Sequence, residues 1–453
     1  MEVEKLNKPA VALCNVGFGA DARSAAVVKG YPALRTVLER VPCEATDGES
    51  IERGVAEVIE EVIRALTVPL REEEWEEALA RAAAWKPEGA RGVVYRGTWE
   101  EVNRYFYRMG WTDGLPVVPP TPQAVEEMLG GTDLAPDHVV AQLPPRGGKA
   151  TVEKIAVNAV MAGALPTHLP VIIAAVEALV DPDARYGTSQ VSTGSWAPFV
   201  VVNGPVRRDI GLNCGSGALS PGNIANAAIG RAIRLVDRNI GGVRPGIEDM
   251  GVFGNPGKYT LVLGENEEES PWEPLHVEQG LGREESAVSV FFPNTYVQAV
   301  AMGTDPESLV LTLARNVPAG KRNALTAILM IPDHARILAQ AGWSKREVVR
   351  RVVESARIPR YRSPYLPPDR TEGLSPRELP QREEDWMPAW TDPDRIRVVV
   401  TGGPGSFMAL WFSSGFSSMF ITKRVHLPKK WRRFAVRYRG VSKTIIRGGS
   451  FYG

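Results

Sequence analysis

The sequence predicts an α/β fold, with a layered α/β core preceded by a short βαβα half-domain. Short apolar runs alternate along the chain with helix-length segments, a pattern that favours strands and helices packed in layers. The 44 glycines and 36 prolines fall at the boundaries between these segments, which indicates many ordered turns. With 453 residues, 44% of them hydrophobic, the chain is long enough to bury a large core without disulfides.

The first 90 residues are predicted to form a small α/β half-domain that ends in a linking helix. Strands are expected over 9–16 and 34–39, and helices over 20–29, 49–66 and 71–90. Helix 49–66 is strongly amphipathic and has an acidic outer face. A sheet of two strands with so few helices cannot bury both of its faces by itself. We therefore expect this unit to pack against the rest of the chain or against a second subunit.

Residues 91–358 are predicted to form a central α/β domain. Its helices are expected over 98–110, 149–164, 169–180, 220–238, 305–316, 332–341 and 343–357, and its strands over 198–205, 259–264, 286–292 and 324–331. Ser220 and Pro221 carry the residue types that start a helix. Residues 359–453 are predicted to be a Pro/Arg-rich connection, a strand over 395–405 and a basic tail, packed on the central domain.

Composition and charge bear on location and partners. The formal net charge is zero, so no global field favours nucleic acid or membrane. No stretch reaches the ~20 apolar residues of a membrane helix, and the N-terminal residues lack the pattern of a signal peptide. Three cysteines without metal-like spacing fit a reducing compartment, so we expect a cytoplasmic protein. The basic tail over 423–440 suits nucleic acid or the acidic region 54–82 of another subunit, and zero net charge favours a homo-oligomer.

Two glycine loops are candidate anion sites. In 144–154 a Gly-Gly turn feeds a helix, and Arg146 and Lys149 stand at its mouth, where free N–H groups and cations favour an anion. Asn158 lies further along the same helix and joins this substrate-binding set. The GGPG loop around Gly403 follows a strand and can bring backbone N–H groups close to a ligand. The alternative at both places is a plain turn.

The segment 201–234 contains many amides within an apolar neighbourhood. These substrate-binding candidates are Asn203, Asn213, Asn223 and Asn226. The last two share a helix face with Gly230, and a buried amide offers a polar ligand both donors and acceptors. The alternative is that the amides fix loops and caps. Cys214 in the same segment is either a nucleophile or an inert core residue, and Cys14 at the end of the first strand poses the same choice.

The segment 264–280 is the candidate catalytic region. Its candidate residues are Glu265, Glu268, Glu273, His276 and Glu278. His276 and Glu278 are expected to alternate with Val277 on an extended piece and to face one side. Carboxylates with a histidine suit a divalent metal or an acid–base pair, so His276 and Glu278 are also candidate metal ligands. The alternative is a solvated acidic turn.

Several uncommon strings occur in order, among them DGLPVVPPT, LPPRGGKATVEKIAVNAVMAGALPTHLP, SPGNIANAAIGRAIRL and GENEEESPWEPLHVE. Over roughly residues 100–430 they resemble the UGSC family, and residues 22–66 resemble the back half of that family's redox domain. The resemblance implies thiol or selenol chemistry on a small molecule, as in glycine-reductase-type selenoprotein subunits. The family motif, selenocysteine or cysteine followed by Gly-Ser-Cys, does not occur here, and the similar run that starts at Cys214 lacks the second sulfur.

Three functional hypotheses follow. The leading one is an enzyme that acts on a small polar, anionic molecule by acid–base or metal-assisted lyase, hydratase or hydrolase chemistry, with a divalent metal as its candidate cofactor. The second is a non-thiol subunit of a reductase-like complex whose partner supplies the thiol or selenol. The third is a scaffold or nucleic-acid binder that uses the basic tail. The leading hypothesis expects a small-molecule substrate and neither nucleic acid nor membrane as partner.

Overall fold

The computed structural model describes residues 8–28, 30–41, 47–84, 92–359, 386–413, 419–439 and 441. In this part of the chain helices and strands interleave, which confirms the α/β fold. No helix there is long and apolar enough to cross a membrane. Most of the expected Pro/Arg-rich connection lies outside the described residues.

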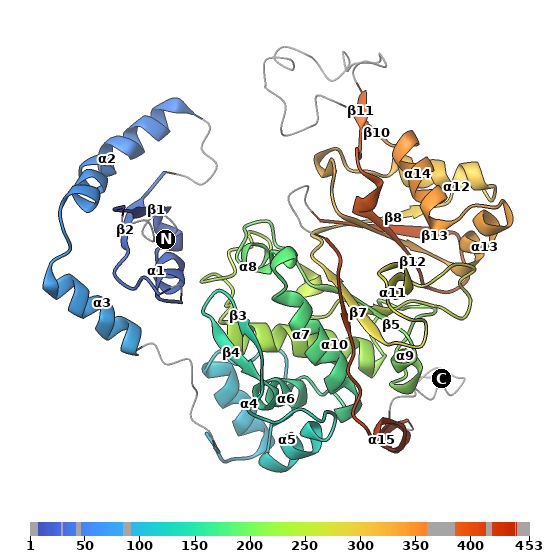
Figure 1. Ribbon diagram of the computed structural model, residues 1–453, viewed down its shortest axis with the longest axis horizontal. Coiled ribbons are helices and arrows are strands. Elements are labelled where there is room, and N and C mark those ends of the chain that lie inside the picture. The colour runs from blue at the N-terminus through green and yellow to red at the C-terminus, as the bar shows by residue number, and fades with distance from the viewer. Residues whose placement is uncertain are drawn as a thin grey trace.

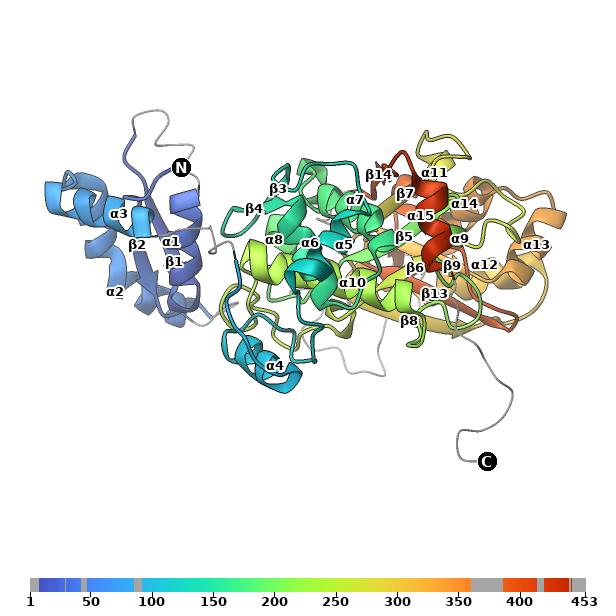
Figure 2. The same ribbon diagram turned by 90° about the horizontal axis from the view of Figure 1, so that it is seen from below.

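The N-terminal unit contains the four elements expected from the sequence. Strands β1 (Val11–Asn15) and β2 (Arg35–Glu39) pair in parallel as a sheet of two strands. Helices α1 (Gly19–Val28) and α2 (Gly48–Thr67) accompany the sheet, and α3 (Glu72–Ala84) follows. Both views place this unit at one side of the larger body (Figures 1 and 2).

The body contains two four-stranded sheets. The first sheet has the order β14 (Ile421–Arg424), β7 (Ala287–Phe291), β5 (Phe199–Asn203), β6 (Val262–Gly264). The second has the order β8 (Thr295–Val300), β13 (Phe407–Phe412), β9 (Thr326–Met330), β12 (Ile396–Val400). In each sheet the third and fourth strands of this order are parallel to each other. The other neighbouring pairs, first with second and second with third, are antiparallel. The two sheets therefore repeat one pairing pattern, although the sequence shows no internal repeat.

The sheets lie face to face between two helical layers. On β5, Phe199 and Val201 point into a core shared by both sheets, whereas Val200 and Val202 join the core beneath the first helical layer. That layer contains α6 (Val152–Met161), α7 (Leu169–Leu179) and α10 (Ile224–Val236). The layer on the second sheet contains α12 (Pro306–Arg315), α13 (Pro332–Gln340) and α14 (Lys345–Ser355). Figure 1 shows these layers on opposite sides of the strands. Strands β5, β7 and β9 are buried along their whole length because both of their faces are covered.

Each sheet with its helical layer forms one half of the body, and the two halves exchange an edge strand. Strand β8 follows β7 in the chain but pairs with β13, and β14 follows β13 but pairs with β7. The crossing segments touch, because the Asn294 amide donates to the Phe412 carbonyl over 3.0 Å. Strands after residue 359 thus complete sheets begun by the central segment. The division of the chain into three domains stays a prediction.

Smaller elements surround this core. They are α4 (Trp99–Arg108), α5 (Pro122–Leu129), β3 (Val139–Leu143), β4 (Gly148–Thr151), α8 (Tyr186–Ser189), α9 (Val206–Asp209), α11 (Leu275–Glu278), β10 (Arg357–Pro359), β11 (Trp386–Pro388) and α15 (Trp431–Tyr438). Helix α15 packs on the body, where Trp431 donates to Asp209 and Tyr438 to Glu127, both over 2.7 Å. Part of the basic tail therefore contacts acidic residues of its own chain.

Two predicted helix starts are wrong. The helix expected from residue 149 begins at Val152, because Gly148–Thr151 pairs with β3 as a strand. The helix expected to begin with Ser220 and Pro221 begins at Ile224. Asn223 replaces Ser220 as its cap, since the Asn223 side chain accepts from the N–H groups of the next turn.

Candidate functional site

The ends of three strands meet at one place in the body. Parallel strands β5 and β6 bring their carboxyl ends to the same edge of the first sheet, where open α/β sheets bind their ligands. The end of β12 joins them, because the Asn266 amide donates to the Val400 carbonyl over 2.7 Å and the Thr401 hydroxyl to the Gly264 carbonyl over 3.0 Å. The Cys214 carbonyl also accepts from Thr401 over 3.0 Å.

A buried carboxylate lies at this junction. Glu265 is fully buried directly after β6, and its Oε2 accepts from the Asn203 side chain and the Leu275 amide, each over 2.7 Å. Its Oε1 accepts from Lys345 Nζ over 3.0 Å. Lys345 is 5% exposed at the start of α14 and reaches Glu278 over 3.3 Å. One lysine thus joins a buried carboxylate to a carboxylate at the rim.

The network continues toward a second rim. The Asn203 side chain donates to Glu267 over 3.1 Å, and Glu267 lies 3.0 Å from Arg207 Nε. Arg207 is 2% exposed on α9 and also forms an ion pair with Glu268 over 3.1 Å. The strand-end cluster is defined here as Asn203, Arg207, Cys214, Glu265, Glu267, Glu268, Glu278 and Lys345. Contacts within hydrogen-bond reach run through it from Glu278 to Glu268.

The two rim carboxyls differ in acidity. Burial raises the pKa of Glu278 above its ordinary value, against the opposing charge of Lys345. Burial also acts to raise the pKa of Glu268, but the hydrogen bond and charge of Arg207 outweigh it, so this pKa lies below its ordinary value. A raised carboxyl pKa beside a lysine is typical of acid–base sites, because such a carboxyl takes up a proton more readily than an ordinary one.

Cys214 is the thiol of the cluster. Burial raises its pKa, and the Arg207 charge opposes this shift only in part. Arg207 lies 4.0 Å from its sulfur. The thiolate is the reactive form of cysteine. The neighbourhood therefore favours the protonated, less reactive thiol.

Within the described part of the chain, one buried side chain of the cluster and one other buried side chain have unpartnered polar atoms. The fully buried Asn203 leaves its Oδ1 without a hydrogen bond, and His276 leaves both ring nitrogens without one. His276 and Glu278 lie on the short helix α11, where side chains two residues apart diverge. The expectation of an extended piece with both side chains on one face is therefore wrong.

Two other residues predicted for the site, Glu273 and Gly403, do not belong to the strand-end cluster. Glu273 is exposed. Gly403 lies against the Cys214 loop, and a Cβ at Gly403 would stand 1.7 Å from the Ser216 hydroxyl. Gly403 thus permits a close approach of two loops, which is a packing role.

The remaining asparagines of segment 201–234 hold loops in place. Asn226 accepts from the Asn213 amide over 2.8 Å and donates to the carbonyls of Asn213, Ala218 and Val262. Asn213 itself caps the turn at Gly215, and Asn223 caps α10. These contacts favour the capping alternative over a ligand-binding amide face.

The predicted anion site around Arg146 is not part of the cluster. Arg146 forms an ion pair with the buried Glu248, Lys149 is exposed on β4, and the Asn158 amide bonds to Lys154 and Asn239. Residues 144–147 turn a hairpin, so they do not open a helix. In both views the β3–β4 hairpin and α11 lie well apart on the body (Figures 1 and 2).

The predicted metal ligands do not converge. Across the described ranges, no group of three or more His, Cys, Asp or Glu side chains is placed to hold a metal ion. Glu278 is bound to Lys345. A metal at His276 and Glu278 stays a prediction.

Sequence reasoning missed two central members of the cluster. Arg207 stands four residues after β5, and a cation so close behind a buried strand was a usable signal. Lys345 begins a helix 80 residues after Glu265, so no local pattern connects the two. Their pairing is a product of the tertiary fold.

A second buried group of charges lies at the last turn of α10. The fully buried Asp237 accepts from Arg234, which also donates to the Tyr186 hydroxyl over 3.0 Å. Burial raises the pKa of Asp237 to about 6, although the Arg234 charge opposes the shift. The adjoining Asp249 forms an ion pair with Lys258.

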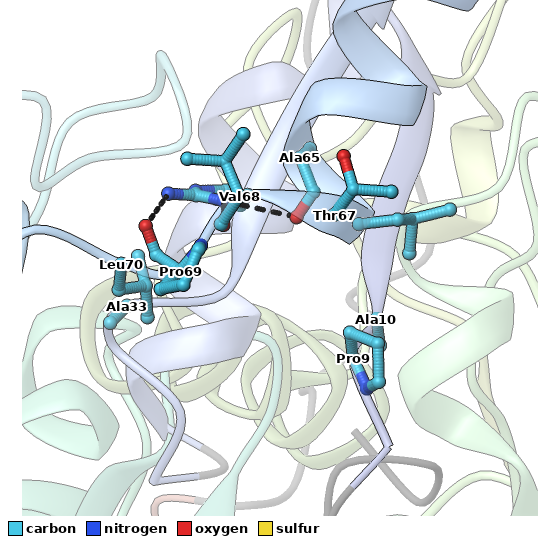
Figure 3. Close-up of a pocket in the computed structure, with 10 residues that line it drawn as sticks. Pro9, Ala10, Ala33, Ala65, Thr67, Val68, Pro69 and Leu70 are labelled. Carbon is cyan, nitrogen blue, oxygen red and sulfur yellow. Dashed lines mark hydrogen bonds between the residues drawn. The ribbon is translucent and has the colours of Figure 1, made fainter.

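A cavity of about 310 Å³ lies in the N-terminal unit, at the end of α2 (Figure 3). Its lining is mostly apolar and includes Pro9, Ala33 and Leu70. Arg35 is its charged member, and its guanidinium already donates to the Ala65, Val68 and Pro69 carbonyls and to Glu74. This cavity offers no free catalytic group.

Comparisons with protein-family models, with curated proteins and with solved structures find no match to this chain.

Proposed function

We propose that this protein is an enzyme that acts on a small polar molecule by acid–base chemistry at the strand-end cluster. One observation carries the proposal: the buried Lys345 joins Glu265 to the rim carboxyl of Glu278, whose pKa is raised by burial. Glu278 is the proposed proton donor and acceptor, and Lys345 holds it in place and balances its charge. Lyase, hydratase or hydrolase chemistry fits such a pair, since each of these reactions moves a proton.

The proposed substrate has a polar, neutral or cationic group. The expectation of an anion depended on Arg146 and Lys149, which lie elsewhere. The strand-end cluster contains four carboxylates and two cations, so its charge favours a neutral or positive group over a negative one. The unpartnered Asn203 Oδ1 is an acceptor that suits an N–H or O–H of the substrate.

Metabolite profiling tests the proposal. Purified protein is incubated with a mixture of small polar metabolites, and compounds consumed are identified by mass spectrometry. We expect the wild-type protein to consume at least one compound, and Glu278→Gln to lose this activity while its circular dichroism stays unchanged. Glu354→Gln on the exposed face of α14 is the matched control and should keep full activity. Equal consumption by wild type and Glu278→Gln would remove Glu278 from the reaction.

Elemental analysis addresses the metal-assisted form of the chemistry. Near-stoichiometric divalent metal that is lost in His276→Ala would place a metal beside the cluster and assign the reaction to metal-assisted catalysis. Activity without bound metal would assign it to Glu278 and Lys345 alone.

A second candidate function has its own observation. Apolar residues Ile51, Val55, Ile59 and Ile63 are exposed along α2, beside a sheet of only two strands. We propose as the alternative that this unit docks a partner of a reductase-like complex, in line with the resemblance to the UGSC family. Native mass spectrometry distinguishes this hetero-complex from a homo-oligomer. A chain that is active alone and indifferent to thiols would contradict the alternative.

A further inference from the structure

Strand β8 is an outer edge of the second sheet, and it lacks the features that usually protect an edge. Protected edge strands are very short or carry charged side chains or proline. Of the other outer strands of the two large sheets, β6 has three residues, β12 contains Arg397, and β14 contains Lys423 and Arg424. Strand β8 has six residues and reads TYVQAV, with neither charge nor proline. Its sequence therefore permits pairing with a further strand.

The backbone of β8 directs one set of hydrogen-bonding groups outward. The Ala301 amide, just after the strand, donates to the Ser406 carbonyl over 2.7 Å, so Ala301 faces β13. Alternate residues of an antiparallel strand point their N–H and C=O groups to opposite sides, so Tyr296, Gln298 and Val300 point theirs away from β13. No strand among the residues that the structure describes pairs with this side.

The side chains of the same residues are uncovered. Tyr296 is 47% exposed, Val300 is 56% exposed, and Gln298 between them is exposed. Phe407 on β13 pairs with Val300 and is 49% exposed. Trp411, on the same face of β13, packs against the core that the two sheets share. This face of the second sheet therefore extends beyond the cover that the first sheet provides.

Strand β8 is complementary to a second copy of itself. Antiparallel pairing about a twofold axis at Gln298 places Tyr296 of each copy opposite Val300 of the other, and all three outward-facing residues then form hydrogen bonds. Aromatic and β-branched residues are favourable cross-strand neighbours, and the two opposed glutamine amides are neutral. Because Tyr296 pairs with Trp411 and Val300 with Phe407 inside each copy, two apolar rows of four side chains would cross the junction.

We propose that this protein forms a twofold dimer in which the β8 strands of two copies pair and join two four-stranded sheets into one sheet of eight strands. The exposed parts of Tyr296, Val300 and Phe407 provide roughly 300 Å² of apolar surface per copy. Interfaces that bury less than about 1,200 Å² in total are weak and reversible. We therefore expect a dimer with a Kd of roughly 10–100 μM.

This dimer leaves the strand-end cluster accessible. Strand β12, whose end joins the cluster, is the opposite edge of the second sheet from β8. The inference is therefore independent of the proposed chemistry, and it uses a different surface from the exposed side of α2.

Sedimentation velocity on the full-length protein tests the dimer. We expect a monomer at about 1 μM and mostly dimer at about 200 μM. Gln298→Lys places two ammonium groups opposite each other at the twofold axis and should raise the Kd about tenfold or more, while circular dichroism stays unchanged because the site is exposed. Gln123→Lys, the same substitution on the exposed side of α5, is the matched control and should keep the wild-type Kd.

A charge-swap pair tests the register. Gln298→Lys and Gln298→Glu should each be monomeric alone, and an equal mixture should dimerise, because opposite charges then meet at the axis. A dimer that persists in Gln298→Lys but is lost in Ile59→Lys would place the contact on α2 and overturn the inference. A wild-type protein that stays monomeric up to about 200 μM would also overturn it and would leave β8 to an extended segment of another protein.

Discussion

The two sheets repeat one pairing pattern but end in different residues. In the first sheet Val202 pairs with Gly264, and the next residues are Asn203 and Glu265. In the second sheet Met330 pairs with Val400, and the next residues are Ile331 and Thr401. The backbone agrees at both places, because the amides of Glu265 and Thr401 donate to the carbonyls of Val202 and Met330 over 3.2 and 2.9 Å.

The backbone pairing is thus common to both sheets, whereas the side chains at the strand ends differ. The shared backbone pattern forms the sheets, and the first half places an amide and a carboxylate where the second half places an apolar side chain and a hydroxyl. The second half contributes instead Lys345, which lies across the junction from Glu265. The cluster is therefore complete only when both halves are folded against each other.

Removal of Lys345 should have the largest effect. Lys345→Met leaves Glu265 buried without its cation, and breaking a buried pair in this way costs about 3–5 kcal/mol of unfolding free energy. Urea unfolding measures the loss. Arg350→Met, on the exposed face of the same helix, should leave the unfolding midpoint unchanged. A stable Lys345→Met protein would show that the cluster does not join the halves.

Asp237 is a second buried carboxyl of the first half, at the last turn of α10, and its stability contribution can be compared with that of the cluster. Its folded pKa of about 6 exceeds the ordinary 3.8, so the folded state holds the proton more tightly than the unfolded state. The stability from this group is complete below pH 4 and is lost as pH rises to about 6, a change of about 3 kcal/mol. Relative to wild type, Asp237→Asn should therefore gain stability between pH 4 and pH 7, as measured by urea unfolding. Parallel pH profiles of the two proteins would contradict the raised pKa, and exposed Asp394→Asn is the control.

The equivalent positions after β5 and β9 allow a direct comparison. Asn203→Leu removes the side-chain donor shared by Glu265 and Glu267, so we expect a loss of about 2–3 kcal/mol of unfolding free energy. Ile331→Val removes one methylene from an apolar site and should cost about 1 kcal/mol. Equal losses would mean that the amide is no more important than a packing side chain.

The smallest expected effect concerns Cys214. Because burial raises its pKa, iodoacetamide at pH 8 should label Cys214 several-fold more slowly in the folded protein than in urea. Cys214→Ser should leave stability nearly unchanged. Faster labelling in the folded state would instead favour thiol chemistry at the cluster.

The sequence predicted the buried strands better than it predicted their arrangement. Strands β5, β7 and β9 were expected because both faces are covered and the runs are continuously apolar. Strands β8, β13 and β14 were missed because exposed and buried residues mix along them; β8 and β14 lie at sheet edges, and β13 lies between β8 and β9. In the cluster, Asn203, Glu265, Glu268 and Glu278 stand in polar segments that end or follow apolar runs and were selected, whereas Lys345 required knowledge of which helix returns to the junction.

The exchange of edge strands has a consequence for protein synthesis. Strand β7 is paired on its outer side by β14, so Val290 stays unpaired on that side until the ribosome adds Ile421, 421 − 290 = 131 residues later. Until then the nascent polypeptide carries an unpaired strand beside a finished helical layer, a state open to association with other chains. A chaperone that shields this edge, or slow translation of the segments before it, would decide how much native protein a cell obtains.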